Sequence, residues 1–255
     1  MTLRHWRATL LTRQSLIFFA LSASLSQPCA PHSDDTPRRE RRKEARPGEL
    51  LKAALDLFVE KGFAATRMDE VALRAGVSKG TVFLYFPSKL ELFKAVVREN
   101  ISGRFQEWNA EFERYDGSSG ELLRYAMFSW WQRVGATQAS GISKLMLSEG
   151  GNFPEIAEFF HQEVVQPGHA ILSRVIARGV ASGEFRPVHI DHAVHGVVST
   201  MIFLALSKHS ACLCTKDGLP LEPLDYLAAQ ADIVVRGLAN SPAPCPPAID
   251  RGTSA

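Results

Sequence analysis

Residues 78–86 combine hydrogen-bonding, cationic and aromatic side chains in a pattern that is typical of a nucleic-acid contact. Ser78 is a favourable N-cap, and Pro87 disfavours helical geometry at Phe86, so a short helix is predicted between them. Val82 and Phe86 share the buried face of this helix at i, i+4 spacing. The residues that point elsewhere are Lys79, Gly80, Thr81, Phe83 and Tyr85. Aromatic side chains on an exposed short helix indicate contact with a partner.

Two other clusters hold side chains that could bind a metal or react as thiols. Three histidines recur at three-residue spacing, which can bring imidazoles to one helix face. These are His189, His192 and His195. One histidine and two cysteines gather in a predicted loop, without the second cysteine pair of common zinc sites: His209, Cys212 and Cys214. We therefore expect no metal site and no cofactor.

The composition is that of a globular protein with a small and a larger domain. The chain has 255 residues, of which 45% are hydrophobic and 22% are charged. Two of its four cysteines, Cys29 and Cys245, lie in proline-rich flanks, so the pattern indicates a reducing compartment rather than a disulfide framework. Neither the His-Glu-x-x-His signature nor a phosphate-cradling loop occurs in the sequence, and we expect no enzyme.

Glycine and capping residues define the helices around residues 78–86. The first helix is predicted to begin near Pro47 and to end at a left-handed Gly62. Its apolar stripe consists of Leu51, Ala54, Leu55 and Phe58. Thr66 is predicted to cap the second helix by accepting from the amide of Asp69, and Gly76 supplies the turn into the third helix. A fourth helix begins at a capping box, 88–91, and two short helices joined by a tight glycine turn match a helix-turn-helix.

Charge is divided unevenly along the chain. Residues 38–104 carry 15 Lys and Arg against 9 Asp and Glu, a net charge of +6. Residues 105–255 carry 11 against 16, a net charge of −5. A basic first part on an acidic body favours contact of the first part with a polyanion. The basic residues 38–46 fit either a solvated helix start or an arm that neutralises phosphates or enters a minor groove.

Residues 62–93 resemble the TetR/AcrR family of regulators. The similarity centres on the run Ala75-Gly76-Val77-Ser78-Lys79-Gly80-Thr81-Val82-Phe83, with Tyr85-Phe86 and Ser88-Lys89 behind it. The match covers roughly residues 44–104. The resemblance implies an all-α fold, with an N-terminal three-helix helix-turn-helix domain and a C-terminal helical bundle for ligand binding and dimerisation. It also implies a transcriptional repressor that a small molecule releases from operator DNA.

The resemblance implies roles for individual residues. Thr66 would cap its helix and touch a phosphate, with Arg67 beside it on the DNA side. The residues that would face the groove are Ser78, Lys79, Gly80 and Thr81, with Lys79 as a reader of guanine. Phe83 would contact a base or sugar, and Tyr85 and Lys89 would bind phosphates. Leu84 departs from the family pattern, and it would either reach a thymine methyl group or pack.

The remainder of the chain is predicted to be helical. No stretch after residue 101 alternates with period two, and helical apolar spacing covers 101–115, 120–137, 141–149, 153–182, 190–208 and 222–239. Pro167 and Gly168 are expected to kink the long segment. The last two helices are apolar nearly all round, which fits either a monomer core or, as the resemblance implies, a homodimer interface.

A cluster of aromatic residues in this body fits either the core or the lining of an apolar ligand pocket. It consists of Phe128, Trp130, Trp131, Phe159 and Phe160. As ligand-binding residues we predict Phe128, Trp131 and Phe159. The inducer, a small molecule, is not identified by the sequence.

The first thirty residues resemble a secretory signal peptide, because Arg4 and Arg7 precede a short apolar run at 16–21. A DNA-binding regulator should stay in the cytoplasm and should not contact a membrane, so we expect that the start codon is assigned too far upstream. The expected organisation is an extension with a basic arm (1–43), a helix-turn-helix domain (44–104, motif about 67–86), a ligand and dimerisation domain (105–240) and a disordered tail (241–255). The alternatives are a DNA-binding protein without a ligand and an exported or membrane-tethered helical protein.

Overall fold

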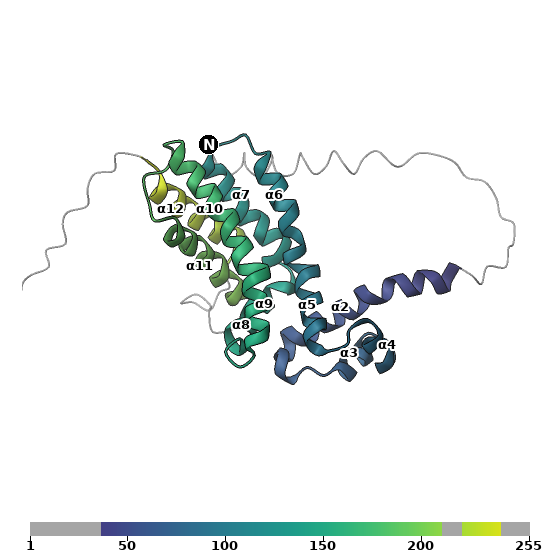
Figure 1. The fold of residues 1–255 in the computed structure, drawn as a ribbon. Coiled ribbons are helices and arrows are strands. Elements are labelled where there is room, and N and C mark those ends of the chain that lie inside the picture. The colour runs from purple at the N-terminus through teal and green to yellow at the C-terminus, as the bar shows by residue number, and fades with distance from the viewer. Residues whose placement is uncertain (1–36, 211–220, 241–255) are drawn as a thin grey trace, which may run out of the picture. The chain divides into compact units, whose positions relative to one another are not determined.

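The computed structural model describes residues 37–210 and 221–240 (Figure 1). The chain divides into two units, Met1–Lys43 and Glu44–Ala255, and the packing described below lies within the second unit. The signal-like segment, Cys212 and Cys214, and the predicted tail lie outside the described residues.

The first helices of the described chain enclose a small aromatic core. They are α2 (Pro37–Ala65), α3 (Met68–Arg74), α4 (Lys79–Tyr85) and α5 (Lys89–Asn100). The ring of Phe58 on α2 meets Phe93 on α5 at 5.4 Å between centroids, and Phe63 meets Phe93 at 5.5 Å, both edge to face. Val71 and Val82 close the same core from α3 and α4. This packing fixes the direction of the two short helices.

The start predicted for the first helix is wrong. Helix α2 begins at Pro37, and Pro47 lies inside it. Residues 38–46 are Arg, Lys, Glu and Ala, which are good helix formers. The helix therefore continues across Pro47, although the proline removes one backbone hydrogen bond. The predicted break at Gly62 is confirmed, because this residue has a positive φ of 84°, with a ψ of 173°, and interrupts the helix.

The N-caps of α4 and α5 are as predicted. Ser78 precedes α4, and its hydroxyl accepts a hydrogen bond from the amide of Thr81 at 3.2 Å. Helix α4 stops before Phe86, and Ser88 caps α5 by accepting from the amide of Glu91 at 3.2 Å. Local sequence therefore sets both ends of α4.

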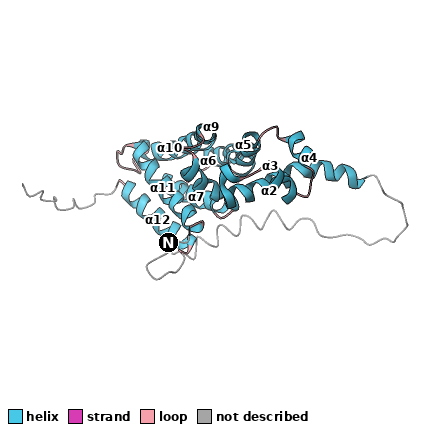
Figure 2. Cartoon of the chain, turned by 90° about the horizontal axis from the view of Figure 1, so that it is seen from below, coloured by secondary structure: helices cyan, strands magenta, loops and turns pink. Residues whose placement is uncertain are grey.

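The body is helical throughout the described residues, whose one β contact is an isolated bridge between Phe185 and Ala239. Its α-helices are α6 (Phe105–Glu113), α7 (Ser119–Trp130), α8 (Gly141–Glu149), α9 (Pro154–Phe160), α10 (Gln166–Ala181), α11 (Ile190–Lys208) and α12 (Pro223–Leu238). The all-α prediction is confirmed. Both views of the ribbon place α3 and α4 at the opposite end of the described unit from α11 and α12 (Figures 1 and 2).

Short segments of other helix types interrupt this body. The 3₁₀ segments are η1 (Ser102–Arg104) and η3 (Gln138–Ser140), and the π-helical segments are η2 (Trp131–Gly135) and η4 (His161–Val165). The segment η4 separates α9 from α10 just before Pro167, where a kink was expected. Pro167 then occupies the first turn of α10, where its missing N–H costs little.

Helix α11 is central to the body because it packs on α8, α10 and α12. By length and composition it could cross a membrane, as core helices of soluble proteins also can. One side is fully buried, with Val194, Val197, Leu204 and Ala205. On the other side Phe203 stays exposed in the single chain, and α12 has two exposed apolar residues of its own, Leu224 and Ile233.

Candidate DNA-binding surface and ligand cavity

The outward side of α4 presents most of the residues expected to meet DNA. Val82 anchors the helix in the core, which leaves Lys79, Gly80 and Phe83 exposed. The Lys79 ammonium lies 6.0 Å from the centre of the Phe83 ring, so a cation and an aromatic face share this surface. Leu84 is 79% exposed and therefore does not pack in the core.

Ser78 and Thr81 organise the N-terminal turn of α4. Their hydroxyl oxygens are 2.9 Å apart and share a hydrogen bond in addition to the capping contact. Gly76 precedes this turn with a φ of 66°, which glycine adopts without strain. The N-terminal end of α4 is thus exposed, hydroxyl-rich and firmly held, as a recognition helix requires.

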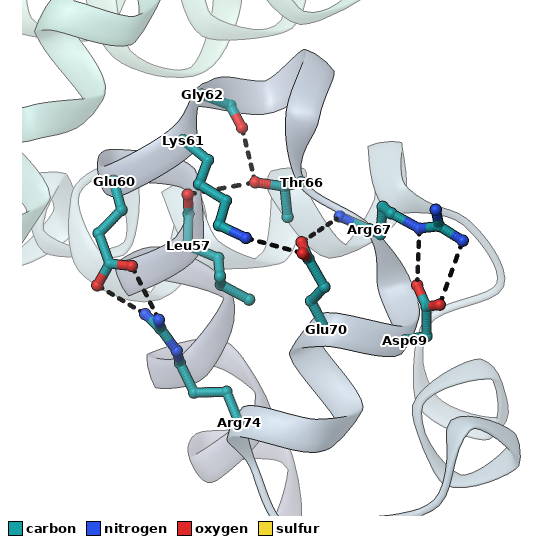
Figure 3. Close-up of polar contacts among 9 residues, drawn as sticks. All are labelled: Leu57, Glu60, Lys61, Gly62, Thr66, Arg67, Asp69, Glu70 and Arg74. Atoms are coloured by element: carbon teal, nitrogen blue, oxygen red, sulfur yellow. Dashed lines mark hydrogen bonds and ion pairs between the residues drawn. The ribbon is translucent and has the colours of Figure 1, made fainter.

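Ion pairs fasten α3 to α2 (Figure 3). The Arg74 guanidinium donates to both carboxylate oxygens of Glu60 at 2.7 and 2.8 Å, and Lys61 donates to Glu70 at 2.7 Å. These hydrogen bonds lower the pKa of both carboxyl groups, which stay ionised. Both pairs are exposed, so they add a modest contribution to the contact between α3 and α2.

The structure contradicts the roles expected of Thr66. Arg67, rather than Thr66, is the N-cap of α3. The Thr66 side chain is 2% exposed, and its hydroxyl donates to the carbonyl oxygens of Gly62 at 2.6 Å and Leu57 at 3.2 Å (Figure 3). The Gly62 interruption frees carbonyls that need donors, and Thr66 supplies one. Its hydroxyl therefore ties the two helices together and does not face a phosphate.

Lys89 also differs from the expectation. Its ammonium group donates to the carbonyl oxygens of Phe63 at 2.6 Å and Ala64 at 3.0 Å, and it lies 4.6 Å from the centre of the Phe63 ring. Burial lowers the pKa of Lys89. The side chain therefore closes the turn between α2 and α3 instead of extending to a phosphate.

The other two expected contacts stay on the surface. Arg67 is exposed and donates to both carboxylate oxygens of Asp69 at 3.2 and 3.3 Å, an exposed pair that a phosphate could exchange (Figure 3). Tyr85 is half-buried at the end of α4, with its ring against the core. The structure thus groups Arg67 and Tyr85 with the exposed residues of α4.

Glu149, at the end of α8, was not expected to touch this region. Its carboxylate accepts a hydrogen bond from the amide of Ala64 at 2.8 Å, across 85 residues of sequence. Gly62 has a positive φ, which glycine adopts without strain, and a Cβ at this position would meet the same carboxylate. Helix α8 of the body thus makes a hydrogen bond with the turn that precedes α3.

The spacing Gly76-Val77-Ser78-Lys79-Gly80 also fits the Gly-x-Ser-x-Gly elbow of hydrolases. That motif places its serine between a strand and a helix. Here Ser78 lies between two helices and caps the second. The geometry therefore does not support a nucleophilic serine.

A cavity of about 150 Å³ lies inside the body. Most of its lining is apolar and comes from Ile101 at the end of α5 and from α6, α7, α10 and α11. One residue each comes from α8 and α9, and both π segments, η2 and η4, also contribute. Such segments often occur at functional sites. Among its lining residues are Phe105, Trp108, Trp130, Val134, Phe160 and Val164.

The three predicted ligand-binding residues do not line this cavity. Trp131 and Phe159 are buried in the core, and the ring of Phe159 lies under Lys94 and Arg98 of α5. Phe128 is half-buried and packs against the same core. The neighbouring Trp130 and Phe160 line the cavity instead. One residue along a helix turns the side chain by about 100°, so an aromatic cluster in sequence does not specify which ring faces inward.

Histidines meet on α10 and α11 without forming a metal site. His169 and His195 have ring centres 4.8 Å apart, and His189 and His192 stack at 3.9 Å. Within the described residues no group of three or more His, Cys, Asp or Glu could hold a metal ion.

The sequence is similar to those of known transcriptional regulators. A family model described as "Bacterial regulatory proteins, tetR family" matches residues 50–96, which run from α2 into α5. The transcriptional regulator RutR of Escherichia coli strain K12 is 45% identical over 173 residues, which cover 62% of this chain and 73% of RutR. The transcriptional activator FasR of Mycolicibacterium smegmatis is 49% identical over 65 residues, but this match spans 26% of the chain and 27% of FasR.

The fold also resembles solved structures. The fatty acid degradation regulator FadR from Bacillus halodurans superposes with a TM-score of 0.60, over 80% of this chain and 97% of FadR. Sequence identity in that comparison is 16%, so the likeness concerns the fold alone.

Proposed function

We propose that this chain, which belongs to the TetR family of bacterial regulatory proteins and is a DNA-binding transcriptional regulator, is a repressor. It represses transcription from its operator until a small apolar molecule enters the cavity of its body. The observation that carries the proposal is that the cavity and α4 share one connecting helix. Helix α5 follows α4 directly, and Ile101 at its end lines the cavity.

DNA recognition is assigned to residues 44–104, with α4 in the major groove. Lys79 and Phe83 are exposed and can reach base edges, and Thr81 lies beside them in the first turn. Arg67 and Tyr85 flank them as phosphate contacts, which position the helix without reading sequence. Thr66 and Lys89 are excluded from the contact set because their polar groups bind backbone carbonyls.

Dimerisation is assigned to α11 and α12. Phe203 on α11 and Ile233 on α12 are large exposed apolar side chains, and Ile233 is 62% exposed. The ring of Phe203 also packs against Tyr226 of α12 at 5.9 Å between centroids. Burial of Phe203 and Ile233 against a second copy removes them from water and places two α4 helices for successive half-sites, about 34–36 Å apart on DNA. The operator is then nearly palindromic.

Coupling between cavity and DNA passes through α5. Arg98, in its last turn, pairs with Glu163 of η4 at 2.7 Å, and the next residues, Val164 and Val165, line the cavity. A ligand that displaces these residues changes the position of α5 and hence of α4. Release requires that the ligand bind this displaced state more tightly than the DNA-bound state.

The principal alternative is a DNA-binding protein that responds to no ligand. An apolar cavity lined by several aromatic side chains and few polar groups argues against it, since ligand sites have this character. Export or membrane attachment is the other alternative. Because its relatives regulate transcription, we place the protein in the cytoplasm.

The test starts from sheared genomic DNA of the source organism, from which purified protein selects fragments. Repression by this mechanism requires a salt-sensitive complex with a promoter fragment and a two-part footprint. Small molecules are then screened for release of that fragment. Val198→Phe, which fills the cavity, is expected to abolish the response, whereas Val180→Phe on the same body, away from the lining, keeps it. If the purified protein forms no salt-sensitive complex with any promoter fragment, the proposal is wrong.

A further inference from the structure

We infer that the effector of this regulator is an uncharged molecule with a body the size of one aromatic ring and a single hydrogen-bonding group held by Ser143 and His169. The inference rests on the proposed function, because it specifies the class of ligand that the same cavity admits.

The size of the ligand follows from the cavity. Its volume of about 150 Å³ matches an apolar protein cavity that holds one benzene molecule. Aromatic side chains, among them Trp108, Phe112 and Trp130, supply much of its wall. Flat rings stack well against such walls, because aromatic pairs gain more than their buried area.

The absence of charge follows from the lining. Lysine, arginine, aspartate and glutamate do not occur among the described residues that line the cavity. An ionised group that left water for this site would find no opposite charge, and such burial is strongly unfavourable. Carboxylates and amines of the same size are therefore excluded.

The hydrogen-bonding group follows from two polar side chains. Ser143, on α8, and His169, on α10, line the cavity with polar side-chain atoms that the described structure leaves without a hydrogen bond within the chain. The indole N–H of Trp130 is a third such group, but it can only donate. Ser143 and His169 come from helices that do not follow each other in sequence, so the fold brings their polar atoms to one cavity. A hydroxyl or amide on the ligand can use either of them as donor and acceptor.

His169 is itself suited to a neutral partner. Burial, and next the positive charge that His195 can carry, lower the pKa of His169. The facing groups are His195 and Asp191 of α11 and His161 of η4, of which Asp191 opposes the shift. The imidazole is thus uncharged near neutral pH and offers a hydrogen bond rather than an ion pair.

The test uses three probes of one size at neutral pH with the full-length protein. Toluene has no polar group, p-cresol adds a neutral hydroxyl, and p-toluate carries a charge. We expect p-cresol to bind about fivefold more tightly than toluene, as one net hydrogen bond provides, and p-toluate to bind at least about tenfold more weakly than p-cresol. Calorimetry measures affinity, and quenching of Trp108 and Trp130 fluorescence places the probe in the cavity.

Variants assign the effect to the two side chains. The double variant Ser143→Ala, His169→Leu is expected to lose the preference for p-cresol while it still binds toluene. His169→Gln, which keeps a neutral hydrogen-bonding group, is expected to retain the preference. Matched controls are Ser148→Ala, on the same helix but exposed, and His192→Leu, which is exposed on α11.

The outcomes separate this inference from the proposed function. Binding of p-toluate as tight as that of p-cresol, or no binding of any probe, overturns the ligand class. If p-cresol binds as expected but a selected promoter fragment stays bound, the ligand class stands and the proposed release fails. If a charged molecule alone releases the fragment, the release stands and the ligand class is wrong.

Discussion

The carboxylate of Glu149 accepts a hydrogen bond from the backbone amide of Ala64 at 2.8 Å, and this contact joins α8 of the body to the turn before α3. Gly62 makes room for it, with a positive φ and no side chain. Lys89 binds two carbonyls of the same turn from the other side. The turn is therefore held from both the body and α5, and any movement of α8 reaches the helix-turn-helix.

Replacement of Glu149 tests this joint. Glu149→Ala leaves the Ala64 amide without its partner and is expected to lower the free energy of unfolding by about 1 kcal/mol. The ratio of operator affinities with and without ligand should also fall, because the body then grips the turn less firmly. Urea unfolding and DNA titration measure the two effects. Glu155→Ala, an exposed residue of α9, is the control, and an equal effect there would refute the joint.

Thr66 is expected to act on stability and not on DNA contact. Thr66→Val keeps the shape but leaves carbonyls of Gly62 and Leu57 without their donor, at a cost of about 1–3 kcal/mol. Thr66→Ser restores the hydroxyl and should recover most of the loss. Operator affinity per folded molecule, measured well below the unfolding temperature, should change little. A loss of affinity with unchanged stability would restore the phosphate contact.

Ile233 is expected to hold the dimer. Ile233→Asp places a charge on the exposed apolar face of α12, where a buried, unpaired carboxylate would oppose association. Sedimentation analysis should show monomer at concentrations where the parent protein is a dimer. Leu147→Asp is the matched control, since Leu147 is 69% exposed on α8, outside this face. A dimeric Ile233→Asp protein would place the interface elsewhere.

Stability is expected to fall on acidification through His209. Burial, followed by the positive charges of Lys208 and Lys144, lowers the pKa of His209, whose ring bonds to Ser140 at 2.7 Å. The unfolded chain then binds more protons than the native one, so stability is lost as pH falls below the ordinary histidine value of 6.5. Urea midpoints at about pH 7.5 and about pH 5.5 measure the loss. His209→Gln should reduce it, and His192→Gln should not.

Much of the DNA-binding part could be predicted because its signals are local. Ser78, Gly76 and Pro87 specify the start, the preceding turn and the end of α4 without help from the body, and the structure has all three as expected. The helical spacing of apolar positions likewise predicted the helices of the body, since burial follows the helical period.

The contacts that the sequence did not reveal are long-range. Lys89 was expected on DNA because the family resemblance implies a phosphate contact there, but the interruption at Gly62 exposes carbonyls that bind it. Glu149 reaches the same turn from a distant helix. The cavity residues were missed by one position at Trp131 and Phe159, because successive residues of a helix point about 100° apart and an aromatic cluster in sequence does not specify which ring faces inward.

Replacement of Tyr85 distinguishes a phosphate contact, which positions the protein on DNA, from a contact that reads the base sequence. Tyr85→Phe removes a hydroxyl assigned to a phosphate, so binding should weaken about equally on every DNA sequence. Competition with the selected fragment and its single-base variants measures this. A loss confined to one base pair would make Tyr85 a reader of bases.

The most direct test of the account concerns Lys79 on the outward side of α4. On the promoter fragment that the protein selects, Lys79→Ala should weaken specific binding by about 1–3 kcal/mol, measured by titration at fixed salt. Arg114→Ala, an exposed cation at the end of α6, should bind like the parent. If Lys79→Ala binds the fragment as tightly as the parent does, α4 does not read the operator and the account is contradicted.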